Sequence, residues 1–65
     1  MKPYNRIKIM DVYQNPTTRF EWLVLDKDDD DKLIKICMIG YENNSTMWKK
    51  NTDRVFGFPC VQEGY

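Results

Sequence analysis

The sequence predicts a small all-β protein, in which five short strands form either a closed barrel or a strongly curved antiparallel sheet. The chain has only 65 residues, its apolar residues recur mainly with a period of two, and no window of about eleven residues has the period of an amphipathic helix. A chain of this length forms one domain at most and buries a small core. Curling the sheet lets both layers of apolar side chains share that core.

The two strongest patterns predict two adjacent strands joined by a hairpin. Residues 19–26 alternate between two apolar sets, with Phe20, Trp22 and Val24 on one face and Leu23 and Leu25 on the other. Residues 33–39 are rich in β-branched and apolar types, with Ile34, Ile36 and Met38 on one face. We expect Phe20 and Trp22 to lie in the core.

Three weaker patterns complete the predicted sheet. Residues 6–13 alternate loosely, residues 46–50 follow a turn-rich cluster, and residues 55–58 end at a proline. Residues 51–54 are expected to form a single turn, of the 3₁₀ type.

The chain is expected to be a single domain over residues 1–65, with residues 5–58 forming the barrel and residues 1–4 and 59–65 forming loose termini. The main rival is an open sheet that dimerises through its uncovered face. Leu23, Leu25 and Ile39 would otherwise have little cover.

The order of these features is similar to that of a known group of proteins. The motifs are Asp11-Val12-Tyr13 before a short loop, the strand Phe20 to Asp26, a charged turn, the strand Leu33 to Ile39 followed by Gly40, and Met47-Trp48 leading to Asp53-Arg54-Val55-Phe56. Over residues 9–58 the chain resembles the small SH3-like barrel proteins of bacteria and their phages. The resemblance implies an SH3-like barrel, and it carries over no functional residue because those families are largely uncharacterised.

The net charge of zero hides an acidic segment. Residues 26–31 contain five Asp and one Lys, so they carry −4 and leave +4 on the remaining residues. An EF-hand starting at Asp26 fails, because Asp31 stands where Gly is required and Cys37 where Glu is required. We expect a solvated hairpin tip. The alternatives are docking to a basic partner and a weak cation site formed by Asp28, Asp29, Asp30 and Asp31.

The residue types exclude most catalytic chemistry. The chain has no His, so neither its one serine, Ser45, nor a cysteine has an imidazole to activate it. With no His and no Cys-x-x-Cys pair, we do not expect the four ligands of a zinc site. We therefore expect no enzyme activity, no cofactor and no metal centre. The N-terminus lacks a secretory pattern, and no apolar run reaches membrane-spanning length, so we expect a cytoplasmic protein with reduced thiols.

The aromatic residues suggest binding instead. Trp48 lies beside two lysines, with Tyr41 near the other end of the same predicted hairpin, and rings beside cations suit a protein anchor or a stacked base. Trp48 closing one end of the core is the alternative. The expected partner-binding residues are Trp48, Tyr41, Lys49, Lys50, Arg54, Leu23 and Leu25.

We expect a small non-catalytic protein-interaction module, of the kind that a phage or another mobile element encodes to bind and modulate a host protein. Two alternatives stay open. A nucleic-acid-binding barrel requires Lys49, Lys50 and Arg54 to share one surface with Trp48 or Tyr41. A structural homodimeric subunit requires an open sheet.

Overall fold

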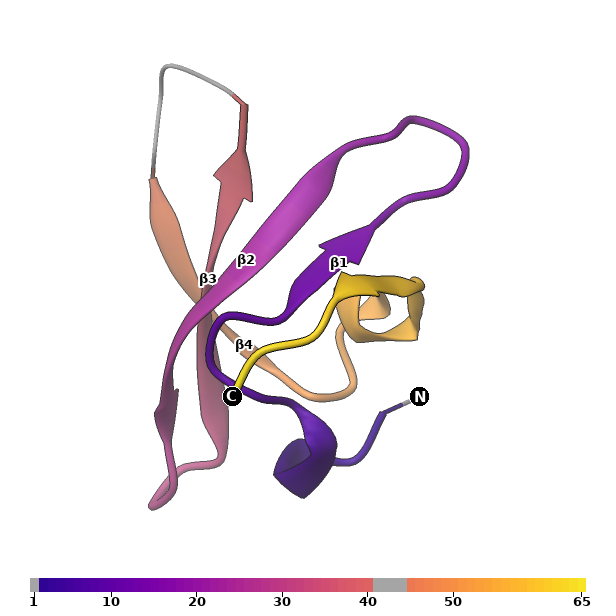
Figure 1. Ribbon diagram of the computed structural model, residues 1–65. Coiled ribbons are helices and arrows are strands. Elements are labelled where there is room, and N and C mark those ends of the chain that lie inside the picture. Colours follow the sequence, from indigo (N-terminus) through magenta and orange to yellow (C-terminus); the bar gives the residue numbers. More distant parts are fainter. Residues whose placement is uncertain (1, 41–44) are drawn as a thin grey trace.

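The computed structural model describes residues 2–40 and 45–65, which form one five-stranded antiparallel sheet and two short 3₁₀ helices (Figure 1). The prediction of an all-β protein is confirmed. In chain order the elements are η1 (Tyr4–Arg6), β1 (Val12–Gln14), β2 (Glu21–Asp28), β3 (Leu33–Ile39), β4 (Thr46–Lys50), η2 (Arg54–Gly57) and β5 (Cys60–Gln62).

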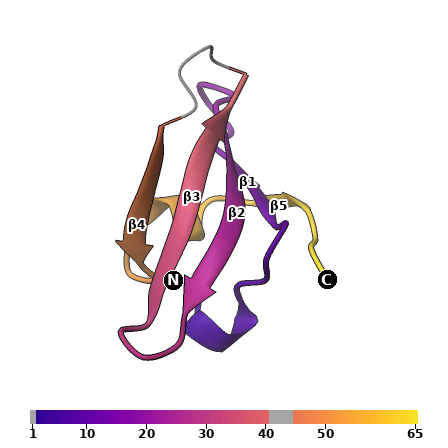
Figure 2. The ribbon, with the colours of Figure 1, turned by 90° about the vertical axis from the view of Figure 1, so that its left-hand side faces the viewer.

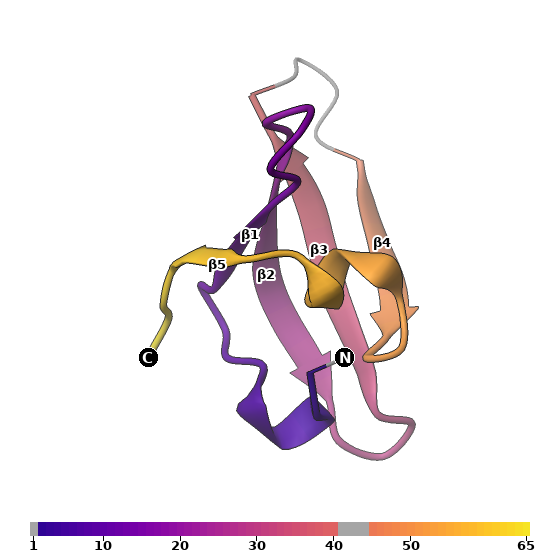
Figure 3. The same ribbon diagram turned by 90° about the vertical axis from the view of Figure 1, so that its right-hand side faces the viewer.

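The strands are arranged in the order β4-β3-β2-β1-β5, and every pair is antiparallel. The sheet is not closed into a barrel, so the strongly curved sheet is the one of the two predicted forms that the chain adopts. Figures 2 and 3 show opposite faces of this sheet: η1, η2 and β5 all lie on the side seen in Figure 3. The other side of β2, β3 and β4 carries no further element in the described part of the chain.

The β2–β3 hairpin forms the centre of the sheet. A bulge between Val24 and Asp26 bends β2. At the hairpin tip, the Asp28 side chain accepts hydrogen bonds from the backbone N–H groups of Asp30 (3.0 Å) and Asp31 (3.4 Å). Lys32 then adopts a positive φ of 56°, which returns the chain into β3. These local bonds show why an Asp-rich run favours this turn.

The hydrophobic core lies between the curved sheet and the two 3₁₀ helices. Its fully buried apolar members come from both ends of the chain and from the central strands: Ile7, Tyr13, Val24, Ile34, Ile36, Val55 and Phe56. The rings of Tyr13 and Phe56 meet edge to face, with their centroids 5.4 Å apart. The predicted inward positions of Val24, Ile34 and Ile36 are confirmed.

Asp11 is the one charged residue among the described buried side chains, with an exposure of 1%. Its carboxylate accepts hydrogen bonds from the Tyr13 hydroxyl (2.8 Å) and from the backbone N–H groups of Lys8 (2.9 Å) and Gly64 (2.7 Å). The Lys2 ammonium lies 3.7 Å away. Burial favours the neutral acid, but these donors and the lysine charge outweigh it and hold the pKa of Asp11 below its usual value.

The N-terminal helix η1 is attached to the β2–β3 hairpin through Tyr4. The Tyr4 hydroxyl donates a 2.7 Å hydrogen bond to Asp29. The ammonium groups of Lys27 and Lys32 lie 4.1 Å and 5.1 Å from the centre of the Tyr4 ring. Part of the acidic tip is therefore engaged with the N-terminus instead of being wholly solvated.

The two terminal strands differ from the prediction. The prediction of a strand at residues 55–58 is wrong. Residues Arg54–Gly57 form η2, and the last strand, β5, follows at Cys60–Gln62. The prediction missed this strand because its three residues have too little alternation to give a pattern. Residues 59–65 are therefore held against β1 rather than loose. At the other end, β1 begins only at Val12, because Met10 has a positive φ of 74°.

Phe20 also departs from expectation. It lies before β2, and 39% of its surface is exposed, so it is not a core residue. Arg19, with a φ of 68°, interrupts the extended chain just ahead of it. The alternation predicted for residues 19–26 therefore applies only from Glu21 to Leu25, where the bulge in β2 ends it.

Candidate functional site

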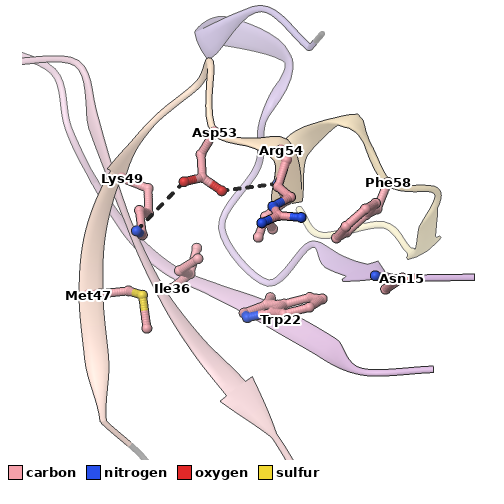
Figure 4. Close-up of a pocket in the computed structure, with 9 residues that line it drawn as sticks. Asn15, Trp22, Ile36, Met47, Lys49, Asp53, Arg54 and Phe58 are labelled. Atoms are coloured by element: carbon pink, nitrogen blue, oxygen red, sulfur yellow. Dashed lines mark hydrogen bonds and ion pairs between the residues drawn. The ribbon is translucent and has the colours of Figure 1, made fainter. Parts of the chain in front are cut away.

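A groove of about 360 Å³ lies on the core side of the sheet, between β4 and the segment that contains η2 (Figure 4). The aromatic rings of Trp22 and Phe58 line it, with their centroids 5.6 Å apart and their planes inclined by 32°. The remaining lining residues are Asn15, Ile36, Met47, Lys49, Asp53, Arg54 and Val55.

Strand register places the sheet residues of the groove. Met47 pairs with Ile36, whose other neighbour is Val24, so Met47 projects to the core side of β4. Trp22 pairs with Tyr13 and projects to the same side of β2. Because β4 is an edge strand and η2 does not reach over all of it, Met47 stays exposed although it faces inward.

Asp53 fixes the opposite wall. Its side chain accepts a 3.1 Å hydrogen bond from the backbone N–H of Val55, which caps η2. Its other carboxylate oxygen lies 3.7 Å from the ammonium group of Lys49 on β4. Both interactions are drawn in Figure 4. Asp53 thus joins η2 to the edge of the sheet, and its charge is balanced by Lys49.

Arg54 contributes a positive charge that nothing in the described chain neutralises. Its side chain is exposed, lines the groove, and makes no hydrogen bond or ion pair with any described residue. In Figure 4 it lies between Asp53 and Phe58. With Lys49 and Asp53 balancing each other, the groove carries a net positive charge.

Such a groove combines flat aromatic surface with a free guanidinium group. Aromatic rings contribute large contact areas at binding sites, and guanidinium binds a carboxylate through two parallel hydrogen bonds. The described groove residues include no nucleophile paired with a base. The aromatic rings and the guanidinium group suit binding of a ligand that carries a carboxylate next to an apolar group.

The opposite side of the sheet carries a second group of exposed apolar residues. We call this side of β1–β4 the outer face. Paired residues across the strands form four rows on it: Gln14, Glu21 and Ile39; Val12, Leu23, Cys37 and Thr46; Asp26, Lys35 and Trp48; and Asp28, Leu33 and Lys50. Leu25, at the bulge, adds to this face. Trp48 is 46% exposed here, with the Lys35 ammonium 5.9 Å from its ring centre.

The structure divides the predicted partner-binding residues between these two surfaces. Lys49 and Arg54 line the groove, whereas Trp48, Lys50, Leu23 and Leu25 belong to the outer face. Tyr41 lies outside the described residues. The nucleic-acid alternative requires Lys49, Lys50 and Trp48 to share one surface. Adjacent residues of β4 point to opposite sides of the sheet, so the described chain places Lys49 on a different surface from Trp48 and Lys50.

Several groove residues were not among the predicted site residues. Trp22 was assigned wholly to the core, and Phe58 to a strand that does not exist at that position. Asp53 carried a usable signal: an Asp two residues before a Val-Phe pair, in an expected turn, is a typical helix cap. The sequence gives no such signal for Met47, since the exposure of its side chain depends on where η2 ends.

The described residues contain no group of three or more His, Cys, Asp or Glu side chains positioned to hold a metal ion, and this includes Asp28, Asp29, Asp30 and Asp31. Cys37 and Cys60 are both free thiols and half-buried. Within residues 2–40 and 45–65, none of the helices has the length and apolar character needed to cross a membrane.

Comparison of the chain with models of protein families, with curated proteins and with solved structures found no match.

Proposed function

We propose that this chain is a non-catalytic protein-interaction module whose groove binds an acidic and apolar segment of a partner protein. The observation that carries the proposal is the Arg54 guanidinium, which has no partner in the described chain and lies at a groove lined by Trp22 and Phe58. We expect this partner in the cytoplasm, and in the host cytoplasm if a phage encodes the chain.

The chemistry of the groove specifies the ligand. Arg54 selects a carboxylate, since guanidinium and carboxylate match in charge and geometry. Trp22, Phe58 and Met47 favour an aliphatic or aromatic side chain next to that carboxylate. A groove of about 360 Å³ is near the lower end of the range for ligand sites, about 300–1,000 Å³, which suits one or two side chains of an extended segment.

Selection from a random peptide library on the immobilised protein tests the proposal. We expect the enriched peptides to contain Asp or Glu close to a large apolar residue. Synthetic versions are then titrated against a Trp48→Phe variant, in which Trp22 is the only tryptophan and its fluorescence reports on the groove. Arg54→Gln should weaken binding at least about tenfold, since a hydrogen bond to a charged group contributes about 1.5–3 kcal/mol.

Arg6→Gln is the matched control, because Arg6 is also exposed but lines no part of the groove. Its affinity for the peptides should equal that of the parent. Enriched peptides that lack a carboxylate, or that bind Arg54→Gln as tightly as the parent, would contradict the proposal. So would a single-stranded oligonucleotide that binds through Arg54 when no selected peptide does.

A further inference from the structure

The outer face carries apolar residues along its centre, interrupted by Lys35, and charges of opposite sign at its two sides. Asp26 and Asp28 lie on β2, whereas Lys50 lies on β4, and β3 runs between them. In the described chain no element covers this face (Figure 2). Leu23, Leu25, Leu33 and Cys37 are only half-buried on it, and Ile39 and Trp48 are exposed.

We infer that the outer face binds a second copy of this chain around a two-fold axis that runs along β3. Rotation about such an axis places β2 of one copy over β4 of the other. Residues in the same row of the sheet then face each other. Asp28 and Lys50 share a row through Leu33, so each Asp28 faces Lys50 of the second copy, and the contact occurs twice.

The residues of β3 lie on the axis and meet their own counterparts. Leu33, Cys37 and Ile39 thereby form an apolar seam along the interface. Lys35 also lies on the axis and faces Lys35 of the second copy, and each of these lysines is paired across the strands with Asp26 of its own copy. Trp48 faces Asp26 of the second copy in the same row, with Leu25 of that copy beside it at the bulge.

Other orientations fit the charges less well. An axis in the interface but perpendicular to the strands would set β2 against β2, with Asp26 and Asp28 facing acidic residues. The groove lies on the opposite side of the sheet, so self-association leaves it open and the two proposals can fail independently.

Charge reversal tests the axis. Asp28 and Lys50 are the charges that face each other, and because the Asp28 side chain also accepts hydrogen bonds in the turn, circular dichroism checks that each variant keeps the fold. Asp28→Lys and Lys50→Glu should each weaken self-association about tenfold, because each change acts twice in a symmetric dimer. Combining the two substitutions should restore the parent affinity to within about threefold. Sedimentation over a range of concentrations measures the association against the 7.9 kDa mass of the chain.

Trp48→Ala should also weaken self-association, whereas Val61→Ala should not, because Val61 is an equally exposed residue on β5, outside the outer face. Cross-linking gives an independent test. With sheets about 10 Å apart, two Cys37 residues are too distant for a direct disulfide, but a short bis-maleimide can join them. We expect a covalent dimer from the Cys60→Ser variant and none from Cys37→Ser.

A chain that stays monomeric at all concentrations would overturn the inference. A dimer in which the combined substitution fails to restore affinity would overturn the proposed axis. A dimer cross-linked through Cys60 alone would overturn the choice of the outer face, and binding of selected peptides to this face in place of a second copy would do the same.

Discussion

The Tyr13 hydroxyl donates a 2.8 Å hydrogen bond to the buried carboxylate of Asp11. The bond joins a core residue of β1 to a charge that also holds the C-terminal segment, through the backbone N–H of Gly64. The Lys2 ammonium lies 3.7 Å from the same carboxylate, so Asp11 contacts residues from both ends of the chain.

Asp11→Asn should destabilise the protein by about 1–3 kcal/mol. The amide presents one acceptor oxygen in place of two, so at least one buried donor loses its partner, and the attraction of Lys2 is lost. Urea unfolding at neutral pH measures the change. Asp30→Asn, at the exposed hairpin tip, is the control and should change stability by less than about 0.5 kcal/mol. Equal effects of the two substitutions would contradict the assigned role of Asp11.

Acid should destabilise the parent more than the Asp11→Asn variant. The pKa of Asp11 is lowered in the folded protein, so its contribution is fully present above the unfolded value of about 3.9. That contribution is lost as the pH falls through the folded pKa. Urea unfolding at about pH 5 and about pH 2 tests this expectation. Parallel losses in parent and variant would show that other carboxylates control acid unfolding.

Alkali should also destabilise the protein, through its buried tyrosine. Burial, and then the hydrogen bond to Asp11, raise the pKa of Tyr13. Its contribution is therefore present below the unfolded value of about 10 and is lost as the pH rises towards the folded value. Tyr13→Phe should flatten the loss of stability above about pH 10.

Tyr4→Phe is the comparison for this alkaline effect. Partial burial and the hydrogen bond to Asp29 raise the pKa of Tyr4 to about 12, but the side chain is half-exposed, so solvent weakens its effect on stability. We expect a smaller change than for Tyr13→Phe. Fluorescence-monitored unfolding across the alkaline range measures both, and a larger effect of Tyr4→Phe would contradict the ranking.

The sequence was sufficient to predict the central hairpin, because Val24, Ile34 and Ile36 alternate with residues of the outer face and the Asp-rich run provides its own turn. It was insufficient at the ends of the chain. There β5 is three residues long and depends on pairing with β1, and positive φ angles at Met10 and Arg19 leave no compositional signal. Long-range pairing, and not local preference, determines these segments.

The same limit applied to the candidate site. Lys49 and Arg54 were predicted from their basic character, but their separation from Trp48 and Lys50 depends on the register of β4. Trp22 and Phe58 were invisible as a pair, since they are far apart in sequence and meet only because η2 ends where it does. Residue types therefore indicated binding, while the geometry of the groove came from the fold.

A core substitution should have a measurable effect in so small a protein. Ile34 is fully buried, so Ile34→Val should cost about 0.5–1.5 kcal/mol. Val61→Ala, at a half-exposed position on β5, should cost less than about 0.5 kcal/mol. Urea unfolding measures the free energy of unfolding of both variants. A larger loss for Val61→Ala than for Ile34→Val would contradict the assignment of Ile34 to the core.

Gly64→Ala should release the C-terminal segment. A Cβ atom at this position would lie 1.9 Å from the backbone oxygen of Ile9 and 2.8 Å from the backbone nitrogen of Asp11, neither of which can move aside cheaply. The hydrogen bond from Gly64 to Asp11 would then break, at a cost of about 1–3 kcal/mol. Gly57→Ala is the matched control, because a Cβ there meets no atom within 4 Å. Amide hydrogen exchange should show lost protection at Gly64 and in β5 for the first variant and none for the second; retained protection in Gly64→Ala would mean that the close approach to Ile9 does not hold this segment.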